Sequence, residues 1–287
     1  MESAPFQNHQ KCVGGNRKML FYLTELFDMP AAFSDLPALT GLVQSECLKR
    51  AAVHFRQNKG RCNGCLIWQF NDVWNCPSWS MIDFEEVPKA ALYHARDFFA
   101  PVAVTCRLER GRATLAAHND TLQHVRFPVT LRVLNLESGE AREEELLADL
   151  EQDSVVPLKT LRVKPTDILQ FRWLDHCVTE LCSAPRKLRL PQANLRVTTE
   201  GSRVTIESDV FAFGVHLAAD TPPSDNDFSL FPGERRTVEF AESPKDLQVK
   251  CVNNMAFDRR KLCRLLSRGL YRLRPQNLAR EIYYILK

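Results

Sequence analysis

Three of the four tryptophans of the chain fall within one stretch of twelve residues, and amide and carboxylate side chains stand between them. The residues of this stretch that could do chemistry are Trp68, Gln69, Asn71, Asp72, Trp74 and Trp79. Indole faces beside amides and a carboxylate suit a ligand that has one apolar face and many hydroxyl groups, which describes a sugar. The alternative is that these tryptophans belong to the core, because tryptophan is highly buried on average. The stretch therefore predicts a carbohydrate site and leaves the core interpretation open.

The ten cysteines offer a second possible chemistry. A chain of this size can bury a core without disulfides, so we expect free thiols that act mostly as small buried hydrophobes. Cys62 and Cys65 have the C-x-x-C spacing of a zinc knuckle, but a structural zinc needs four ligands and no second such pair occurs. Cys177 and Cys182 are an equally weak pair. We therefore expect no metal site and no cofactor.

Composition excludes several classes of protein. The 287 residues are 45% hydrophobic and 25% charged, which is ordinary for a globular protein. No apolar run approaches the roughly 18 residues that a membrane span needs, and Met1-Glu2-Ser3 does not open a signal peptide. The sequence therefore predicts a soluble, cytoplasmic protein with no membrane partner.

Charge is distributed unevenly. Residues 256–287 hold nine Lys and Arg against two acidic residues, a local charge of +7, whereas residues 1–255 carry 29 basic and 33 acidic residues, or −4. A basic tail is where a nucleic-acid or membrane-surface interpretation would begin. Leucines recur in it at helical spacing, however, and no nucleic-acid module accompanies it. An amphipathic basic helix is favoured, and no nucleic-acid partner is expected.

The elements around the tryptophans follow an α/β order. Apolar residues recur with a helical period over residues 18–58 and 89–99, and the short apolar run 65–70 between them predicts a buried strand. Helix, buried strand, loop and helix are typical of an α/β domain. Sites in such folds form where parallel strands end, and the tryptophans lie at the end of this strand and in the loop after it.

Beyond Pro101 the pattern becomes all-β. Short alternating segments separated by turn residues predict strands at 102–108, 113–118, 129–136, 155–163 and 168–174, then at 194–199, 203–208, 210–218, 236–240 and 247–252. Each set has the size of a small antiparallel sandwich. The expected hinges are residues 99–101 and 188–191, and the acidic segment 140–149 is left as either a helix or a strand.

The tryptophan stretch also resembles a known family. Residues Gly64 to Trp74, followed by Ser78-Trp79-Ser80, Ile82-Asp83 and Pro88-Lys89, look like the last barrel strand of the β-mannosidases of glycoside hydrolase family 2 and the loop and helix after it. Further matches are Asn8-His9-Gln10-Lys11, Gly15-Asn16, Gln44-Ser45-Glu46, Phe99-Ala100-Pro101, Ser224-Asp225-Asn226-Asp227-Phe228 and Phe231-Pro232-Gly233-Glu234. The resemblance spans about residues 5 to 252 in consistent order.

The resemblance implies a multidomain α/β plus all-β fold. Residues 1–100 would be the C-terminal portion of a (β/α)8 glycosidase barrel, 101–189 and 190–255 two antiparallel immunoglobulin-like β-sandwiches, and 256–287 a basic helical tail. It implies a retaining exo-glycosidase that hydrolyses terminal, non-reducing β-D-mannose residues with two carboxyl groups about 5 Å apart. A complete barrel takes about 250 residues. The catalytic glutamates are therefore expected upstream of this chain, and Glu46, Glu85 and Glu86 are not assigned to catalysis.

Roles for individual residues follow from the resemblance alone. Trp68 would be the platform for the non-reducing mannose, and Gln69, Asn71 and Asp72 would shape that wall of the subsite. Trp74 and Trp79 would line its mouth or lock the loop, and Asp83 would orient the loop through backbone hydrogen bonds. The implied partners are a β-mannoside oligosaccharide and the missing N-terminal portion of the enzyme.

Two other functions stay open. One is a related family 2 activity such as an exo-glucosaminidase, and the other is a non-catalytic carbohydrate- or protein-binding module, since immunoglobulin-like folds host many functions. A partial barrel exposes strand edges. We therefore expect residues 1–100 alone to behave poorly and residues 101–255 to fold independently.

Overall fold

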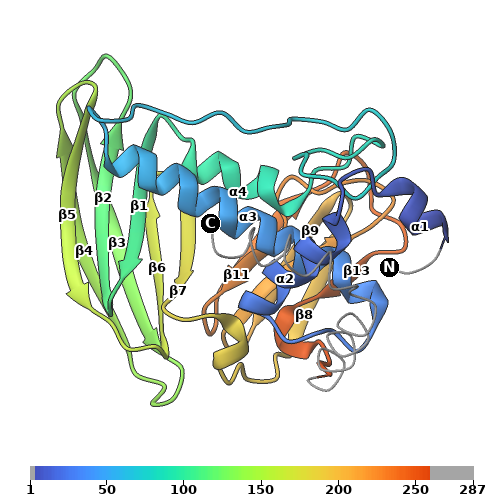
Figure 1. Cartoon of the computed structure of the whole chain (residues 1–287). Coiled ribbons are helices and arrows are strands. Elements are labelled where there is room, and N and C mark those ends of the chain that lie inside the picture. Colours follow the sequence, from blue (N-terminus) through green and yellow to red (C-terminus); the bar gives the residue numbers. More distant parts are fainter. Residues whose placement is uncertain (1–3, 259–287) are drawn as a thin grey trace.

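The computed structural model describes residues 4–258, so the predicted basic tail lies outside the described residues from position 259 on. Within this range four α-helices come first: α1 (Ala4–His9), α2 (Gly15–Leu26), α3 (Leu36–Gln57) and α4 (Ala90–Phe98). Three short 3-10 helices, Phe33–Asp35, Pro185–Lys187 and Val252–Asn254, lie in connections. All strands follow α4, as Figure 1 shows.

The predicted helix over residues 18–58 is two helices, α2 and α3. Pro30 lies between them and cannot donate a helical backbone hydrogen bond, and Pro37 occupies the first turn of α3, where proline is tolerated. The linking backbone pairs instead with the end of the described chain: Ala31 N donates to Ala256 O at 2.8 Å, and Asp258 N donates to Met29 O at 2.8 Å. The predicted helix at 89–99 is confirmed as α4.

The first sandwich has two antiparallel sheets. One has the order β1-β2-β5 and the other β4-β3-β6-β7. The strands are β1 (Val102–Glu109), β2 (Arg112–Asn119), β3 (Val125–Asn135), β4 (Ala141–Leu150), β5 (Ser154–Arg162), β6 (Asp167–Trp173) and β7 (His176–Leu181). The undecided segment 140–149 is strand β4, whose glutamates face solvent while Ala148 and Leu150 enter the core. Strand β7 was not predicted.

The second sandwich is smaller. Its sheets have the orders β12-β9-β8 and β11-β10-β13. The strands are β8 (Leu195–Glu200), β9 (Arg203–Ser208), β10 (Ala212–Ala218), β11 (Phe228–Leu230), β12 (Arg235–Glu239) and β13 (Gln248–Lys250). Its core is separate from that of the first sandwich and contains the fully buried Val204, Ile206 and Leu230. The three-residue strand β11 was too short to give a periodic signal.

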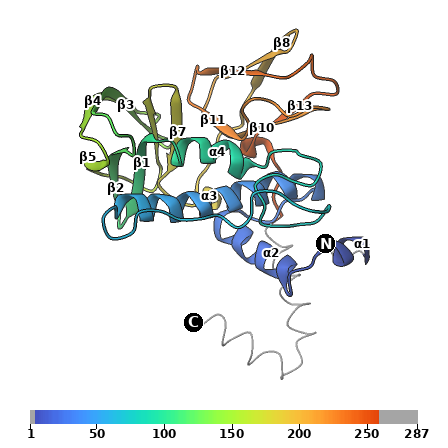
Figure 2. The same cartoon turned by 90° about the horizontal axis from the view of Figure 1, so that it is seen from above.

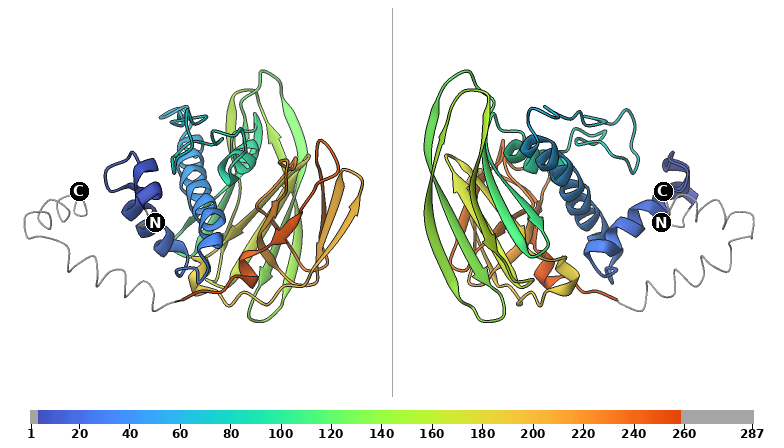
Figure 3. Two further views of the ribbon diagram at one scale, coloured as in Figure 1. Left: turned by 90° about the vertical axis from the view of Figure 1, so that its right-hand side faces the viewer. Right: turned by 60° about the vertical axis from the view of Figure 1, so that its left-hand side comes forward.

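Helices α3 and α4 cross one side of both sandwiches (Figures 2 and 3). Close packing of α3 on β10 requires Gly214, because a Cβ at that position would lie 2.9 Å from Leu42 Cδ1, and its φ of +58° also favours glycine. A further cluster that includes Leu134, Phe211 and Phe231 joins the two sandwiches. The described residues therefore form one packed body in which α3 is the common support.

The segment 65–70 differs from its prediction. It was expected to be a buried strand, but it pairs with no strand among residues 4–258, and its thin trace runs along α3 in Figure 1. Exposure alternates along it: Leu66 is 101% exposed, Trp68 77% and Phe70 61%, whereas Cys65 and Ile67 pack on the cluster between α3 and α4. A strand of a parallel sheet is buried only when neighbouring strands cover it, and the described residues supply none.

The cysteines are only partly as expected. All nine in the described residues are free thiols, but only Cys106 and Cys251 are buried, so the expectation that most of them act as buried hydrophobes was wrong. Among residues 4–258, no helix combines the length and the apolar character needed to cross a membrane.

Candidate functional site

The tryptophan loop, residues 68–89, folds back on itself through main-chain hydrogen bonds. Ile82 N donates to Phe70 O at 2.9 Å, Asp72 N donates to Ile82 O at 3.1 Å, and Met81 N donates to Gln69 O at 3.2 Å. These bonds place the residues that follow Trp68 beside those that follow Trp79. The two indoles therefore belong to one small region of the surface.

Exposure separates the three tryptophans of the loop. Trp68 is 77% exposed and Trp79 48%, so neither indole lies in the core that residues 4–258 form. Trp74 is half-buried. Exposed indoles on an ordered loop are unusual in a folded protein, and a patch of exposed aromatic surface marks an interaction site.

Trp74 fastens the loop to the N-terminal segment. The ring of His9 stacks on its indole with centroids 4.6 Å apart, and Lys11 Nζ lies 4.7 Å from the ring centroid. His9 Nδ1 also donates a hydrogen bond to Asn75 O. Of the two roles that the resemblance offered for Trp74, these contacts favour locking the loop.

The carboxylate of Asp72 lies beneath the loop. It accepts hydrogen bonds from Ser80 Oγ at 2.6 Å and Ser78 Oγ at 2.8 Å, and Lys89 Nζ lies 3.2 Å away. Burial opposes ionisation, but the serine hydroxyls and the charge of Lys89 outweigh it and hold the pKa of Asp72 below its usual value. With only 2% of its side chain exposed, Asp72 supports the loop from below.

The two amides lie nearer the surface. Gln69 Nε2 donates to Asn71 O at 2.9 Å, and the exposed Asn71 donates through Nδ2 to Asp72 O at 3.2 Å. Asp83 behaves as expected, because its Oδ1 accepts the backbone N–H groups of Glu85 and Val87, each at 2.9 Å. This Asx-type turn closes the far end of the loop.

Helix α3 holds the loop from the other side. Gln44 Nε2 lies 2.8 Å from Trp79 O and 3.0 Å from Ser80 O. Sequence reasoning gave no role to His9, Gln44 or Lys89, although all three belong to the stretches that carry the resemblance. They lie far from their partners along the chain or act only once the loop has folded, so no local pattern marks them.

Comparisons with known proteins agree with the resemblance. Residues 188–255 match the Ig-fold domain of the mannosidase family. A β-mannosidase B of Thermothelomyces thermophilus is 31% identical over 87% of this chain and 34% of its own length. The β-mannosidase of Bos taurus is 33% identical over 33% of this chain and 12% of its own length.

Over most of its length the chain is thus similar to β-mannosidases.

Solved structures show the fold. The β-D-mannosidase of Dictyoglomus thermophilum has a TM-score of 0.76 and 24% identity, covering 88% of this chain and 34% of its own. An exo-chitosanase of Amycolatopsis orientalis has a TM-score of 0.63 and 15% identity, covering 83% of this chain and 36% of its own. The chain thus spans about a third of the length of the fungal β-mannosidase and of both solved enzymes.

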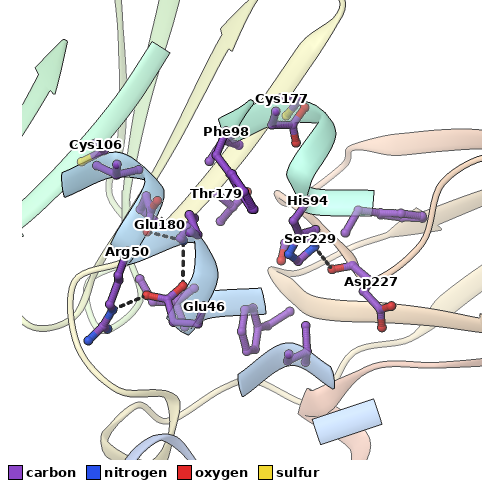
Figure 4. A pocket seen from close by; sticks show the side chains of 18 of the residues that line it. Glu46, Arg50, His94, Phe98, Cys106, Cys177, Thr179, Glu180, Asp227 and Ser229 are labelled. Carbon is purple, nitrogen blue, oxygen red and sulfur yellow. Dashed lines mark hydrogen bonds and ion pairs between the residues drawn. The ribbon is translucent and has the colours of Figure 1, made fainter. Parts of the chain in front are cut away.

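A second region of the chain is a cavity of about 120 Å³ at the junction of α3, α4 and the two sandwiches (Figure 4). Lys49 on α3 bridges two carboxylates there, with its Nζ 2.8 Å from Glu46 Oε2 and 2.8 Å from Glu180 Oε2. Burial, reinforced by the charge of Glu46, raises the pKa of Glu180. Two carboxylates this close resemble a retaining pair.

The Glu46 and Glu180 pair is nevertheless structural. Lys49 holds the position between the two carboxylates, and all three side chains are largely buried. A substrate would have to displace that lysine and leave two buried charges without a partner. The pair therefore fixes α3 against β7.

The motif Ser224–Phe228 joins α4 to the second sandwich at the same junction. His94 Nε2 lies 3.1 Å from Asp227 O, Tyr93 donates its hydroxyl to Pro223 O at 3.0 Å, and Arg96 Nη2 lies 3.2 Å from Asp225 Oδ1. Figure 4 shows His94 and Asp227 facing each other across this contact. The motif that carried part of the resemblance thus orients α4 against the second sandwich.

Proposed function

We propose that this chain is the C-terminal portion of a retaining exo-β-mannosidase that removes terminal β-D-mannose from β-mannosides. The observation that carries the proposal is 31% identity to a β-mannosidase across 87% of this chain. Residues 1–100 are then the end of the barrel, 101–189 and 190–255 the two sandwiches, and 256–287 the tail. The acid/base and nucleophile glutamates come from sequence outside this chain.

The unpaired segment 65–70 supports the barrel assignment. In a (β/α)8 barrel one face of each strand packs on the outer helices and the other fills the interior. Cys65 and Ile67 pack on the α3 and α4 cluster, while Leu66, Trp68 and Phe70 face away from it into solvent. Helices precede and follow the segment, as the barrel repeat requires. The exposed face is then the interior surface that neighbouring strands would cover.

The sugar wall is assigned to the exposed indoles and amides of the tryptophan loop. Trp68 stands at the carboxyl end of the unpaired segment, where barrel enzymes place their sites. The exposed faces of Trp68 and Trp79 suit the apolar side of a pyranose, and Gln69 and Asn71 supply amides for its hydroxyl groups. Asp72 and Trp74 hold the loop in place.

Substitution of Trp68 tests this wall in the assembled enzyme, that is, this chain together with the missing barrel portion. Trp68→Ala should lower kcat/KM for a β-mannoside by roughly tenfold or more, the equivalent of one lost aromatic contact. Trp68→Phe should keep most of the activity. Leu66→Ala, which shortens an equally exposed side chain on the same segment, is the matched control for a general packing effect. Equal losses in Trp68→Ala and Leu66→Ala would contradict the assignment.

A related activity on glucosaminides is the second candidate. The fold similarity to an exo-chitosanase, with a TM-score of 0.63, favours it. Assaying the assembled enzyme on matched β-mannoside and β-glucosaminide substrates separates the two, and the proposal requires the mannoside to have the higher kcat/KM.

A further inference from the structure

Strand β8 forms one edge of the sheet β12-β9-β8 and pairs with β9 alone. Figure 2 shows it at the outer tip of the second sandwich, on the side away from α2. Five of its six residues are exposed, including Val197 at 39%. An open edge strand is a template for pairing with another chain. Strand β8 is therefore a candidate interaction surface.

The usual protection of an edge is missing from β8. Edge strands are commonly blocked by lysine, proline or a β-bulge, and β5, an edge of the first sandwich, has Pro157, Lys159 and an irregular register with β2. The other edge of the β8 sheet is covered, because Glu239 N on β12 donates to Ser224 Oγ at 2.9 Å and Ser224 N donates to Glu239 O at 2.7 Å. Strand β8 contains no lysine or proline and pairs with β9 in unbroken register.

The backbone hydrogen bonds of the sheet show which groups of β8 are free. Phe240 N donates to Ser202 O at 2.9 Å, so the even-numbered positions along β9 bond β12. Hydrogen-bonded and non-hydrogen-bonded positions alternate in an antiparallel pair, so the odd-numbered positions of β9 bond β8. Because Thr198 lies opposite Thr205, the even-numbered residues of β8 bond β9. The groups that point to the open edge, where residues 4–258 offer no backbone partner, are those of Leu195, Val197 and Thr199.

The outward side chains of this sheet form three cross-strand rows. In order from β12 to β8 the rows are Arg235, Glu207 and Arg196, then Thr237, Thr205 and Thr198, then Glu239, Arg203 and Glu200. Arg196 Nη1 lies 3.6 Å from Glu207 Oε2, and Arg203 Nε lies 3.5 Å from Glu239 Oε1. Charges alternate along both outer rows. The two rows end on β8 with opposite signs, at Arg196 and Glu200, on either side of Thr198.

We propose that β8 pairs antiparallel with β8 of a second copy of this chain, about a two-fold axis through Thr198. Arg196 of each copy then lies opposite Glu200 of the other, which joins the rows so that every charge has an opposite charge beside it. Val197 of each copy lies opposite Thr199 of the other, and their outward backbone groups form the hydrogen bonds of the new pair. An axis through Val197 or Thr199 would leave Arg196 without an opposite charge.

Charge reversal tests this pairing by sedimentation equilibrium of the full chain. All samples carry Leu66→Lys, which places a charge on the unpaired segment 65–70 and suppresses association through it. This parent should dimerise with a dissociation constant on the order of 100 µM, as for a small interface. Arg196→Glu and Glu200→Arg each place like charges opposite one another, so each alone should dimerise at least roughly tenfold more weakly. An equimolar mixture of the two should restore dimers, because both contacts then join opposite charges.

Two further variants separate strand pairing from a general effect of charge. Arg235→Glu makes the same change of charge on β12, away from the axis, and should leave dimerisation unchanged. Val197→Pro removes an N–H that points to the open edge, so the monomer should fold but not dimerise.

The proposal is overturned by a parent chain that stays monomeric, including the case in which another segment of the enzyme occupies the edge. It is also overturned if the mixture dimerises no better than either charge variant alone, if Arg235→Glu weakens dimerisation as much as Arg196→Glu, or if Val197→Pro dimerises like the parent. The readout needs no hydrolysis, so its failure is distinct from failure of the β-mannosidase proposal.

Discussion

Asp72 accepts two serine hydroxyls and faces Lys89 at the point where the tryptophan loop turns back toward α4. Asp72→Asn removes the charge but keeps the shape of the side chain. The new amide group cannot accept hydrogen bonds from all three donors. We expect a loss of about 2 kcal/mol in the free energy of unfolding, as for hydrogen bonds to a buried charge. Chemical denaturation measures it, and Glu85→Gln, an exposed carboxylate of the same loop, is the control.

The same residue predicts a pH dependence. The folded-state pKa of Asp72 is lower than its unfolded value, so its contribution to stability is fully present above the unfolded pKa and is lost as pH falls through the folded one. Below about pH 4, the usual range for an aspartate, the native chain should lose stability more steeply than Asp72→Asn. If the free energy of unfolding falls equally steeply with decreasing pH in the two proteins, this role for Asp72 is contradicted.

Residue types in the tryptophan loop were sufficient to propose a candidate site, because indoles beside amides suit a sugar. They were not sufficient to assign roles. Asp72 and Asn71 are neighbours in the sequence, yet one is buried and the other exposed. His9 and Gln44 contact the loop from 35 or more positions away in the chain. Such contacts depend on the tertiary fold and leave no local signal.

At the scale of elements, α3 connects every other unit. Gln44 bonds the tryptophan loop, Ser45 lies 2.5 Å from His94 on α4, Lys49 pairs with β7, and Arg56 pairs with Asp120 after β2. Most helices and strands were predictable because their faces alternate between core and solvent. The short β7 and β11 were missed, and the exposure of segment 65–70 was not foreseen because burial of a strand depends on neighbours that the sequence pattern does not reveal.

The exposed segment 65–70 gives a prediction in which one substitution improves solubility of the chain and prevents its assembly. Leu66→Lys should reduce aggregation of the chain, because it places a charge on an unpaired apolar strand. The same change should prevent assembly with the missing barrel strands, since a lysine would enter the barrel interior. Light scattering and co-elution measure the two effects. Leu122→Lys, at an 85% exposed leucine of the first sandwich, should change neither. Unimpaired assembly of Leu66→Lys would refute the barrel interpretation.

At the scale of the whole molecule, each sandwich has its own core, so residues 101–255 should fold without the helices. Substitution of Glu180 should affect the stability of the full chain more than that of this fragment. In the full chain, Glu180→Gln leaves the buried Lys49 with one carboxylate fewer and should cost about 3 kcal/mol. In the fragment Lys49 is absent and the change should cost little. Thermal unfolding of both forms tests this, and equal losses would show that α3 does not rely on that ion pair.

The proposed function divides the enzyme in two: this chain supplies the sugar wall, and another polypeptide segment supplies the catalytic carboxylates. Hydrolysis of a chromogenic β-mannoside tests it most directly, measured with the purified chain alone and after mixing with a polypeptide that supplies the preceding barrel strands. We expect activity in the mixture only. Hydrolysis by the chain alone, or a folded complex that hydrolyses no β-mannoside, would contradict it.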